Sequence, residues 1–254
     1  FSDVPSGGED SMKIRDLRKE VHENKTKVLA DVVWEDCNCQ NYTMFFEVTG
    51  SLGEKLSANP HAFLLGGLFP AFHFGERRVQ IEGAVCSELM HGLKKAVQIL
   101  NNWYYESKKP LVTIEPTSEF FQEEKAHPHS AFFFSGGVDS FAVLRENHLN
   151  YAKKHPRFFR DGIVVFGLEL DEPKSFSHVI SHLEPAAKEA GIELVTVNTN
   201  IYLEYRPEDA KKRFRFWIDE FGGAALAAIA HALSNKYKDV SIAGNCDPNL
   251  LCAW

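Results

Sequence analysis

The sequence is poor in cysteine and contains no long apolar run. Only 5 of its 254 residues are cysteine, at irregular spacing, which is too few for a disulfide framework and favours a reducing, cytoplasmic compartment. The longest nearly unbroken apolar stretch, 62–72, is about half of the ~20 residues that a bilayer-crossing helix needs. No basic segment followed by an apolar one stands at the start of the chain. We therefore expect a cytoplasmic protein without a membrane-spanning segment.

The sequence also has no excess of basic over acidic residues. The formal net charge is −7 at pH 7, which argues against an extensive nucleic-acid surface and leaves open only a local basic groove. With 44% hydrophobic and 25% charged residues, the composition is that of a folded globular protein. A chain of this length forms one large domain or two modest ones.

The first part of the chain predicts a smaller mixed α+β domain over residues 12–115. Residues 1–11 are rich in glycine, serine and acidic side chains and are interpreted as a flexible arm or a cloning remnant. Met12 begins the first helical pattern, and β-branched and aromatic runs predict a strand pair at 28–35 and 43–48. The other predicted elements are a helix after Asn59 that Gly66, Gly67 and Pro70 would weaken or kink, a strand at 79–81, a helix from Ser87 with Leu89, Leu93, Val97 and Leu100 on one face, and a strand at 111–115.

The second part of the chain alternates between strand-like and helix-like segments. It follows a polar, proline-bearing stretch, 116–130, which is the predicted linker. The predicted strands are 131–134, 162–169, 193–197 and 240–243, and the predicted helices are 140–154, 175–190 and 219–235. This alternation predicts an α/β domain over 131–254, a doubly wound parallel sheet with flanking helices. Because the sequence stops at Trp254 directly after an apolar run, we expect this domain to be C-terminally incomplete.

The loop after the first of these strands carries the strongest chemical signal. It consists of Ser135, Gly136, Gly137, Val138, Asp139 and Ser140, and it opens a predicted helix. Two glycines let backbone amides approach an anion, the helix N-terminus adds unpaired N–H groups, and two serines add hydroxyl donors. The alternative is an ordinary glycine turn with a polar cap. The motif differs from a Walker A loop because it has no lysine. We expect it to bind a phosphate or pyrophosphate.

This loop resembles the PP-loop, S-G-G-x-D-S, of the N-type ATP pyrophosphatases, and the resemblance covers residues 130–254. It implies an adenine nucleotide alpha hydrolase-like fold and an ATP-dependent enzyme. Such an enzyme activates a carboxylate or carbonyl as an adenylate, releases pyrophosphate and then forms a C–N bond. The resemblance implies that Ser135, Asp139 and Ser140 are catalytic, and that Asp139 helps to place Mg²⁺. It also implies that adenine lies against Gly167, Leu168 and Glu169 at the end of the second strand.

Within that superfamily the sequence resembles the 7-cyano-7-deazaguanine synthase group. The likeness rests on Gly244 and Asp247 after the fourth strand, and it implies a purine-like or other carboxylate-bearing substrate. The chain departs from that group because only Cys246 and Cys252 stand where the group carries a four-cysteine zinc site. The residues preceding the linker are a further departure.

Two other functions remain open at this point. One is transfer RNA thiolation or another base modification, with Cys246 as the sulfur carrier. The other is a nucleotide-binding subunit of a multi-protein complex, as in antiphage defence, with the PP-loop as a sensor or relic. In that case the N-terminal domain would bind a protein partner. The substrate, either a small molecule or a macromolecule, is not fixed by the sequence.

Three further groups of residues are candidates. Arg213 and Arg215 belong to a basic run that is either a solvated face or a source of cations for the ATP phosphates. His178 and His182 have metal-ligand spacing but lack an apparent third ligand, so we expect them to be surface residues. Cys37–Cys39 is a C-x-C pair without a second pair for zinc, and we expect free thiols in a strand connection.

Overall fold

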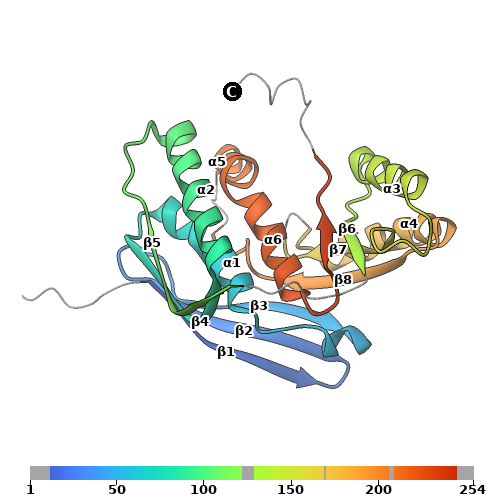
Figure 1. The fold of residues 1–254 in the computed structure, drawn as a ribbon, viewed down its shortest axis with the longest axis horizontal. Helices are drawn as coiled ribbons and strands as arrows, with labels where there is room; N and C mark the ends of the chain where they lie inside the picture. The colour runs from blue at the N-terminus through green and yellow to red at the C-terminus, as the bar shows by residue number, and fades with distance from the viewer. Residues whose placement is uncertain (1–11, 122–128, 169, 206–208, 245–254) are drawn as a thin grey trace, which may run out of the picture.

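The computed structural model describes residues 12–121, 129–168, 170–205 and 209–244 (Figure 1). The strands in these ranges form one mixed sheet, in the order β5-β4-β1-β2-β3-β8-β7-β6-β9. Antiparallel pairs join β1, β2, β3 and β8, and all the other neighbours are parallel. The helices in the described ranges include none that is both long enough and apolar enough to cross a bilayer.

The predicted mixed α+β part contains five strands and two long helices. The predicted strand pair is confirmed as the antiparallel pair β2–β3, and a helix begins at Pro60 after the Asn59 cap, as expected. The elements are β1 (Met12–His22), β2 (Lys25–Val33), β3 (Tyr42–Thr49), the 3₁₀ turn η1 (Gly50–Glu54), α1 (Pro60–Phe74), β4 (Arg78–Cys86), α2 (Ser87–Tyr105) and β5 (Thr113–Phe120).

The helical pattern predicted from Met12 is wrong, because this segment is the strand β1. Met12 and Ile14 are buried and alternate with the half-buried Lys13 and the exposed Arg15, as a strand requires. A β-bulge then interrupts the pairing with β2 between Arg15 and Arg18, and Asp16 takes a positive φ of 54°. The extra residue in the bulge shifts the alternation between buried and exposed side chains. The apolar residues after it therefore have a spacing that is typical of a helix.

Gly66 and Gly67 bring α1 close to the sheet. A Cβ on Gly66 would lie 2.7 Å from Met44 Sδ, and one on Gly67 would lie 2.6 Å from Ile14 Cδ1. α1 continues through both glycines and through Pro70 to Phe74. The two glycines that the sequence predicted to weaken or kink the helix are therefore packing positions.

The second part of the chain has the predicted doubly wound order. Strands β8, β7, β6 and β9 are adjacent and parallel, and all four lie where the sequence predicted strands. The elements are β6 (Ser130–Phe133), α3 (Val138–Asn150), β7 (Phe159–Phe166), α4 (Pro173–Ala190), β8 (Glu193–Thr199), α5 (Ala210–Arg215), the π-helical turn η2 (Phe216–Phe221), α6 (Gly222–Ala232) and β9 (Asp239–Ser241).

Helices cover both faces of this sheet. Phe132 on β6 packs in one cluster with Leu144 of α3 and Leu183 of α4. Phe133, the next residue, points to the opposite face and belongs to the cluster that contains Ile229 of α6. Figure 1 shows α3 and α4 together, apart from α1, α2 and α6.

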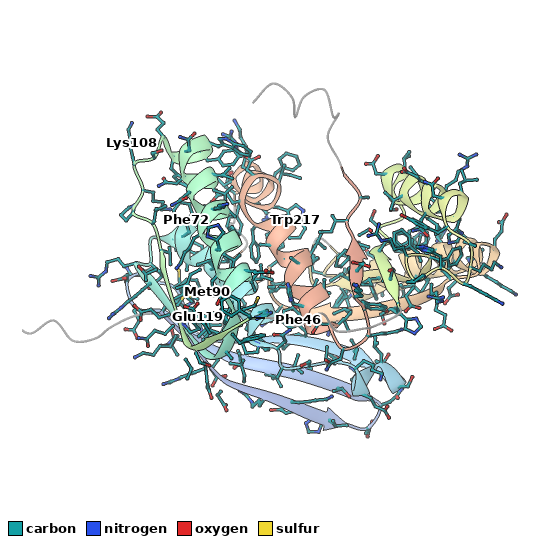
Figure 2. The ribbon with its side chains drawn as sticks, in the orientation of Figure 1. Phe46, Phe72, Met90, Lys108, Glu119 and Trp217 are labelled. Atoms are coloured by element: carbon teal, nitrogen blue, oxygen red, sulfur yellow. The ribbon has the colours of Figure 1, made fainter. Side chains whose placement is uncertain are left out.

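The two predicted parts share one sheet and one large core. Phe46 of β3 is in register with Thr199 of β8, and this antiparallel pair joins the two sets of strands. On the α1 side, Phe46, Phe72 and Met90 are buried in the same cluster as residues of α6 (Figure 2). The predicted linker boundary at 116 is wrong, because β5 pairs with β4 as far as Phe120.

Candidate functional site

The glycine loop, residues 135–140, lies at the carboxyl end of β6 and leads directly into α3. Helix α3 begins at Val138, two residues earlier than predicted, with Gly137 at the N-cap. Ser135 and Asp139 are exposed, whereas the Ser140 side chain is buried beneath the loop. In an open α/β sheet this edge is where ligands bind, because the strand ends and helix N-termini meet there.

The backbone amides of this loop are available to a ligand. α3 has no side-chain cap, although Asn59 caps α1 and Asp209 caps α5. The first N–H groups of a helix have no acceptor within the helix, and in the described part of the chain those of α3 have none outside it either. Ser140 Oγ donates to the Gly137 carbonyl at 2.8 Å, and the Gly137 N–H donates to Ser135 Oγ at 3.3 Å. These bonds shape the loop: they engage the Gly137 amide and leave the first amides of α3 open.

Gly136 is required by the shape of the loop. Its φ of 79° lies in the left-handed region, and a Cβ would lie 3.0 Å from Leu183 Cδ2 of α4. The loop is thus held between α3, which follows it, and α4, which packs beside it. An anion bound here would meet backbone that is fixed before binding.

The residues expected to contact adenine lie at a step in the sheet edge. Phe133 at the end of β6 is in register with Ile163, whereas β7 continues to Phe166, which is in register with Asn198 of β8. Gly167 and Leu168 follow directly. The Leu168 side chain is buried, so that only backbone atoms of this segment are available to a ligand. Glu169 lies outside the described residues.

Gly244 reaches the same edge from β9. Ser241 of β9 is in register with Phe132 of β6. Gly244 comes as many residues after Ser241 as Ser135 comes after Phe132. Gly244 and Ser135 are therefore at matching positions beyond the ends of the two strands. Gly244 is exposed. Asp247, the other residue that carried the family likeness, lies outside the described residues, as do Cys246 and Cys252.

The two candidate arginines lie on the short helix α5 and not in a connecting loop. The predicted helix boundary at 219 is wrong, since helical structure already begins at Ala210. Arg215 forms an ion pair with Asp219 at 3.5 Å, and the Arg213 carbonyl accepts a hydrogen bond from Tyr202 Oη at 3.2 Å. The charge of Arg215 is therefore partly balanced by Asp219. This favours the interpretation that Arg215 belongs to a solvated face and does not bind the ATP phosphates.

Sequence reasoning missed a half-buried polar cluster between α1, α2 and η2. Glu220 Oε2 accepts hydrogen bonds from Tyr105 Oη at 2.7 Å and from His73 Nδ1 at 2.9 Å. Burial would raise the pKa of Glu220, but the bonds from His73 and Tyr105 hold it below its ordinary value. π-helical turns such as η2 are rare and often mark functional positions. These residues are distant in the sequence, so no local pattern could have revealed the cluster.

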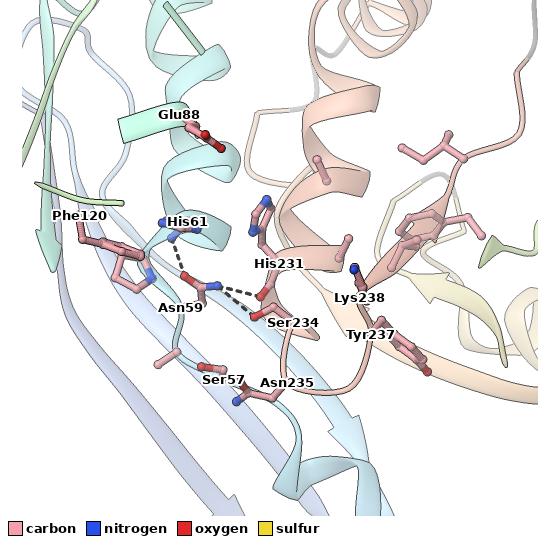
Figure 3. Close-up of a pocket in the computed structure, with 17 residues that line it drawn as sticks. Ser57, Asn59, His61, Glu88, Phe120, His231, Ser234, Asn235, Tyr237 and Lys238 are labelled. Atoms are coloured by element: carbon pink, nitrogen blue, oxygen red, sulfur yellow. Dashed lines mark hydrogen bonds between the residues drawn. The ribbon is translucent and has the colours of Figure 1, made fainter. Parts of the chain in front are cut away.

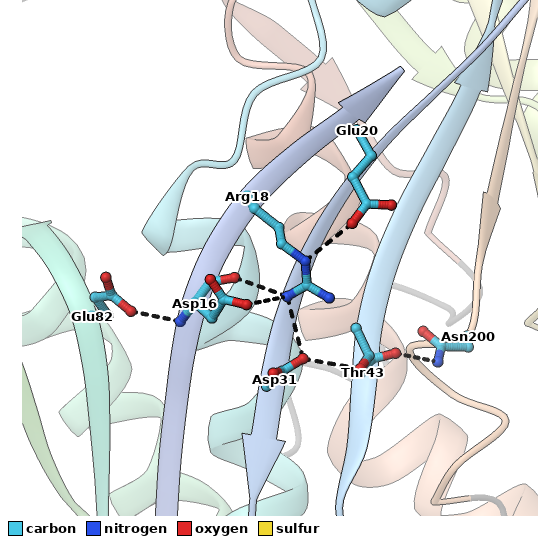
Figure 4. Close-up of polar contacts among 7 residues, drawn as sticks. All are labelled: Asp16, Arg18, Glu20, Asp31, Thr43, Glu82 and Asn200. Atoms are coloured by element: carbon cyan, nitrogen blue, oxygen red, sulfur yellow. Dashed lines mark hydrogen bonds and ion pairs between the residues drawn. The ribbon is translucent and has the colours of Figure 1, made fainter. Parts of the chain in front are cut away.

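A second polar network lies on the open face of β1, β2 and β3 (Figure 4). The Arg18 guanidinium contacts the carboxylates of Asp16 at 2.8 Å, Glu20 at 3.1 Å and Asp31 at 3.3 Å. One cation among three carboxylates has no charge left for an anionic ligand, and pairs this exposed contribute little stability. We therefore assign this network to the solvated face of the sheet.

The histidine and cysteine candidates for metal ligands are two pairs on different segments of the chain. Within the described ranges, no group of three His, Cys, Asp or Glu side chains is arranged to hold a metal ion. His178 and His182 are exposed on α4, and Cys37 and Cys39 are free thiols between β2 and β3. A Mg²⁺ bound together with ATP needs only one or two carboxylates, because phosphate and water supply the other ligands. The exposed Asp139 carboxylate fits that limited requirement.

Comparison of the chain with protein-family models, with curated proteins and with solved structures finds no match.

Proposed function

We propose that the protein binds ATP through the glycine loop and uses it to form an adenylate. The observation that carries this proposal is the uncapped N-terminus of α3, placed behind two glycines at the carboxyl end of β6. Unpaired amides and the helix dipole favour a phosphate at this position. The match of the loop sequence to the PP-loop supports pyrophosphate, rather than a single phosphate, as the group that is held.

The residues of the loop have distinct proposed roles. The amides of the first α3 turn and the Ser135 hydroxyl would donate to the β- and γ-phosphates, where negative charge grows as pyrophosphate leaves. Ser140 is buried and bonded to the Gly137 carbonyl, so it would set the position of the amides. Asp139 would hold Mg²⁺, which neutralises phosphate charge when bound. The adenine would lie at the end of β7, beside Gly167.

The acceptor substrate is proposed to be a carboxylate or carbonyl compound, purine-like or otherwise, that attacks the α-phosphate. The P–O bond to pyrophosphate breaks as the new P–O bond to the substrate oxygen forms. A nitrogen nucleophile then displaces AMP and forms the C–N bond. The products that report this route are AMP and pyrophosphate.

Calorimetry with Mg-ATP tests the site directly. Ser135→Ala and Asp139→Ala should each weaken binding about tenfold or more, because a charge-assisted contact contributes ~1.5–3 kcal/mol. The matched control is Ser181→Ala, an exposed serine on α4 away from the loop. Unchanged binding by the combined Ser135→Ala, Asp139→Ala and Ser140→Ala variant would remove the assignment.

Product analysis tests the chemistry separately from binding. With an acceptor substrate present, the proposal requires AMP and pyrophosphate. Release of ADP and phosphate alone would contradict adenylate formation and leave ATP binding intact. Tight ATP binding without any turnover across a panel of carboxylate substrates would favour the nucleotide-binding subunit instead.

A further inference from the structure

A cavity of about 660 Å³ lies on the α6 side of the sheet, apart from the glycine loop (Figure 3). Its walls come from the start of α1, the end of β5, the second half of α6 and the edge strand β9. This volume is in the range that holds a small ligand. Because residues from both predicted parts of the chain line it, the cavity exists only in the assembled fold.

Two imidazoles form the polar centre of the cavity. His61 Nε2 accepts the Cys86 N–H at 2.9 Å, so the proton of the neutral ring is on Nδ1. The His231 ring lies edge-on to the His61 ring, with centroids 5.3 Å apart. Among the described residues, His61 Nδ1 and both ring nitrogens of His231 have no hydrogen-bond partner. Together they offer at least two donors and one acceptor.

Both imidazoles are neutral at physiological pH. Burial, with a contribution from His231, lowers the pKa of His61 to about 4. Burial also lowers the pKa of His231. The charged lining residues, Glu88 and Lys238, are both exposed. A buried ion needs a compensating charge beside it, so the inner cavity is suited to an uncharged group.

The remaining walls are flat or apolar. The Phe120 ring lies parallel to that of His61, at an interplanar angle of 7°, and is 39% exposed. Aliphatic and aromatic side chains close the opposite side, among them Ala230, Phe133 and Ile242. Aromatic rings favour offset stacking and edge contacts with another ring. A planar ligand could therefore contact the ring of Phe120 while its edge bonds to the imidazoles.

We infer that this cavity binds a small, uncharged heteroaromatic molecule whose edge carries both a hydrogen-bond donor and an acceptor, at a site separate from that of ATP. The inference rests on the lining of the cavity and does not depend on what the glycine loop binds. His231 would form the hydrogen bonds with the edge of the ligand. Its side chain projects from α6 into the cavity wall, and its ring nitrogens have no hydrogen-bond partner among the described residues.

The test uses isoquinolin-1(2H)-one as the probe, a neutral bicyclic lactam with an adjacent donor and acceptor. Its binding to the full chain is measured by ligand-observed NMR titration, and protein-observed spectra of the His231 imidazole give the local report. His231→Leu keeps the approximate volume and removes both nitrogens, and Ala230→Phe fills the cavity. His182→Leu, on the exposed face of α4, is the matched control. Circular dichroism confirms that each variant is folded.

The lactam should bind wild type and His182→Leu equally, about tenfold more weakly to His231→Leu, and not to Ala230→Phe. Isoquinoline-1-carboxylate, an anion of similar size, should bind more weakly than the lactam. Saturating Mg-ATP and the Ser135→Ala variant should leave lactam binding unchanged. Unchanged binding to folded Ala230→Phe, no binding to wild type, tighter binding of the carboxylate, or displacement by ATP would each overturn the inference.

Discussion

Gly167 lies directly against the Thr199 carbonyl, where the ends of β7 and β8 meet. A Cβ at position 167 would lie 1.7 Å from Thr199 O, and the φ of Gly167 is 96°. The contact is with backbone, so no side-chain rotation can relieve it. The backbone at the proposed adenine position therefore has a conformation and a close contact that only glycine permits.

Gly167→Ala should lower the free energy of unfolding by about 3 kcal/mol or more, because it adds both a steric clash and φ strain. The measurement is urea denaturation followed by circular dichroism. Gly191→Ala is the matched control: its φ is also positive, at 69°, but nothing lies within 4 Å of its Cβ. It should cost only about 1 kcal/mol. Equal losses for the two variants would show that the close approach to Thr199 is not maintained in solution.

The Glu220 cluster should contribute to the attachment of η2 to α1 and α2. Glu220→Gln keeps the size of the side chain but removes the charge that accepts from His73 and Tyr105. We expect a loss of about 1–3 kcal/mol in unfolding free energy, since a partly buried charge-assisted contact is replaced by a poorer one. Chemical denaturation at pH 7 measures it.

Asp219→Asn is the comparison for that variant, because Asp219 is the neighbouring acid and, among the described residues, pairs only with the exposed Arg215 at 3.5 Å. An exposed pair of this kind contributes about 1 kcal/mol or less. If Asp219→Asn were as destabilising as Glu220→Gln, the cluster would have no special role in holding η2.

The sequence was informative where local residues determine local structure. Apolar runs and the loop of Ser135–Ser140 predicted the four parallel strands and the strand-to-helix turn, because both signals are contained within a few consecutive residues. The strand β1 was missed because the bulge at Asp16 changes the alternation. The glycines of α1 were expected only to weaken or kink the helix, because the strands that they face, β1 and β3, are distant in the sequence.

The cavity could not have been predicted for a related reason. His61 is joined to the Cys86 amide and faces His231, and these residues come from α1, the β4–α2 junction and α6. Each histidine alone has an ordinary sequence context. The direct packing of α1 against α6, within the sheet that the β3–β8 pairing joins, brings the histidines together.

Acid should destabilise the fold through His61 well before carboxylates are protonated. The ordinary histidine pKa is 6.5, and burial, with a contribution from His231, lowers that of His61 to about 4 in the folded protein. Between these values the unfolded chain binds the proton and the folded chain does not, so stability falls as pH is lowered from 6.5 to about 4. From pH 7 to pH 5 the loss from His61 should be about 2 kcal/mol.

Denaturation curves of wild type and His61→Gln at pH 7 and pH 5 measure this loss. The glutamine can still accept the Cys86 N–H but does not titrate, so its stability should fall less over this interval. His182→Gln, which replaces an exposed histidine, should behave as wild type does. The acids with lowered pKa values, Asp36, Glu47 and Glu220, lose their contribution only below about pH 4.5, outside the interval. An identical pH dependence in wild type and His61→Gln would mean that His61 is not buried as a neutral ring.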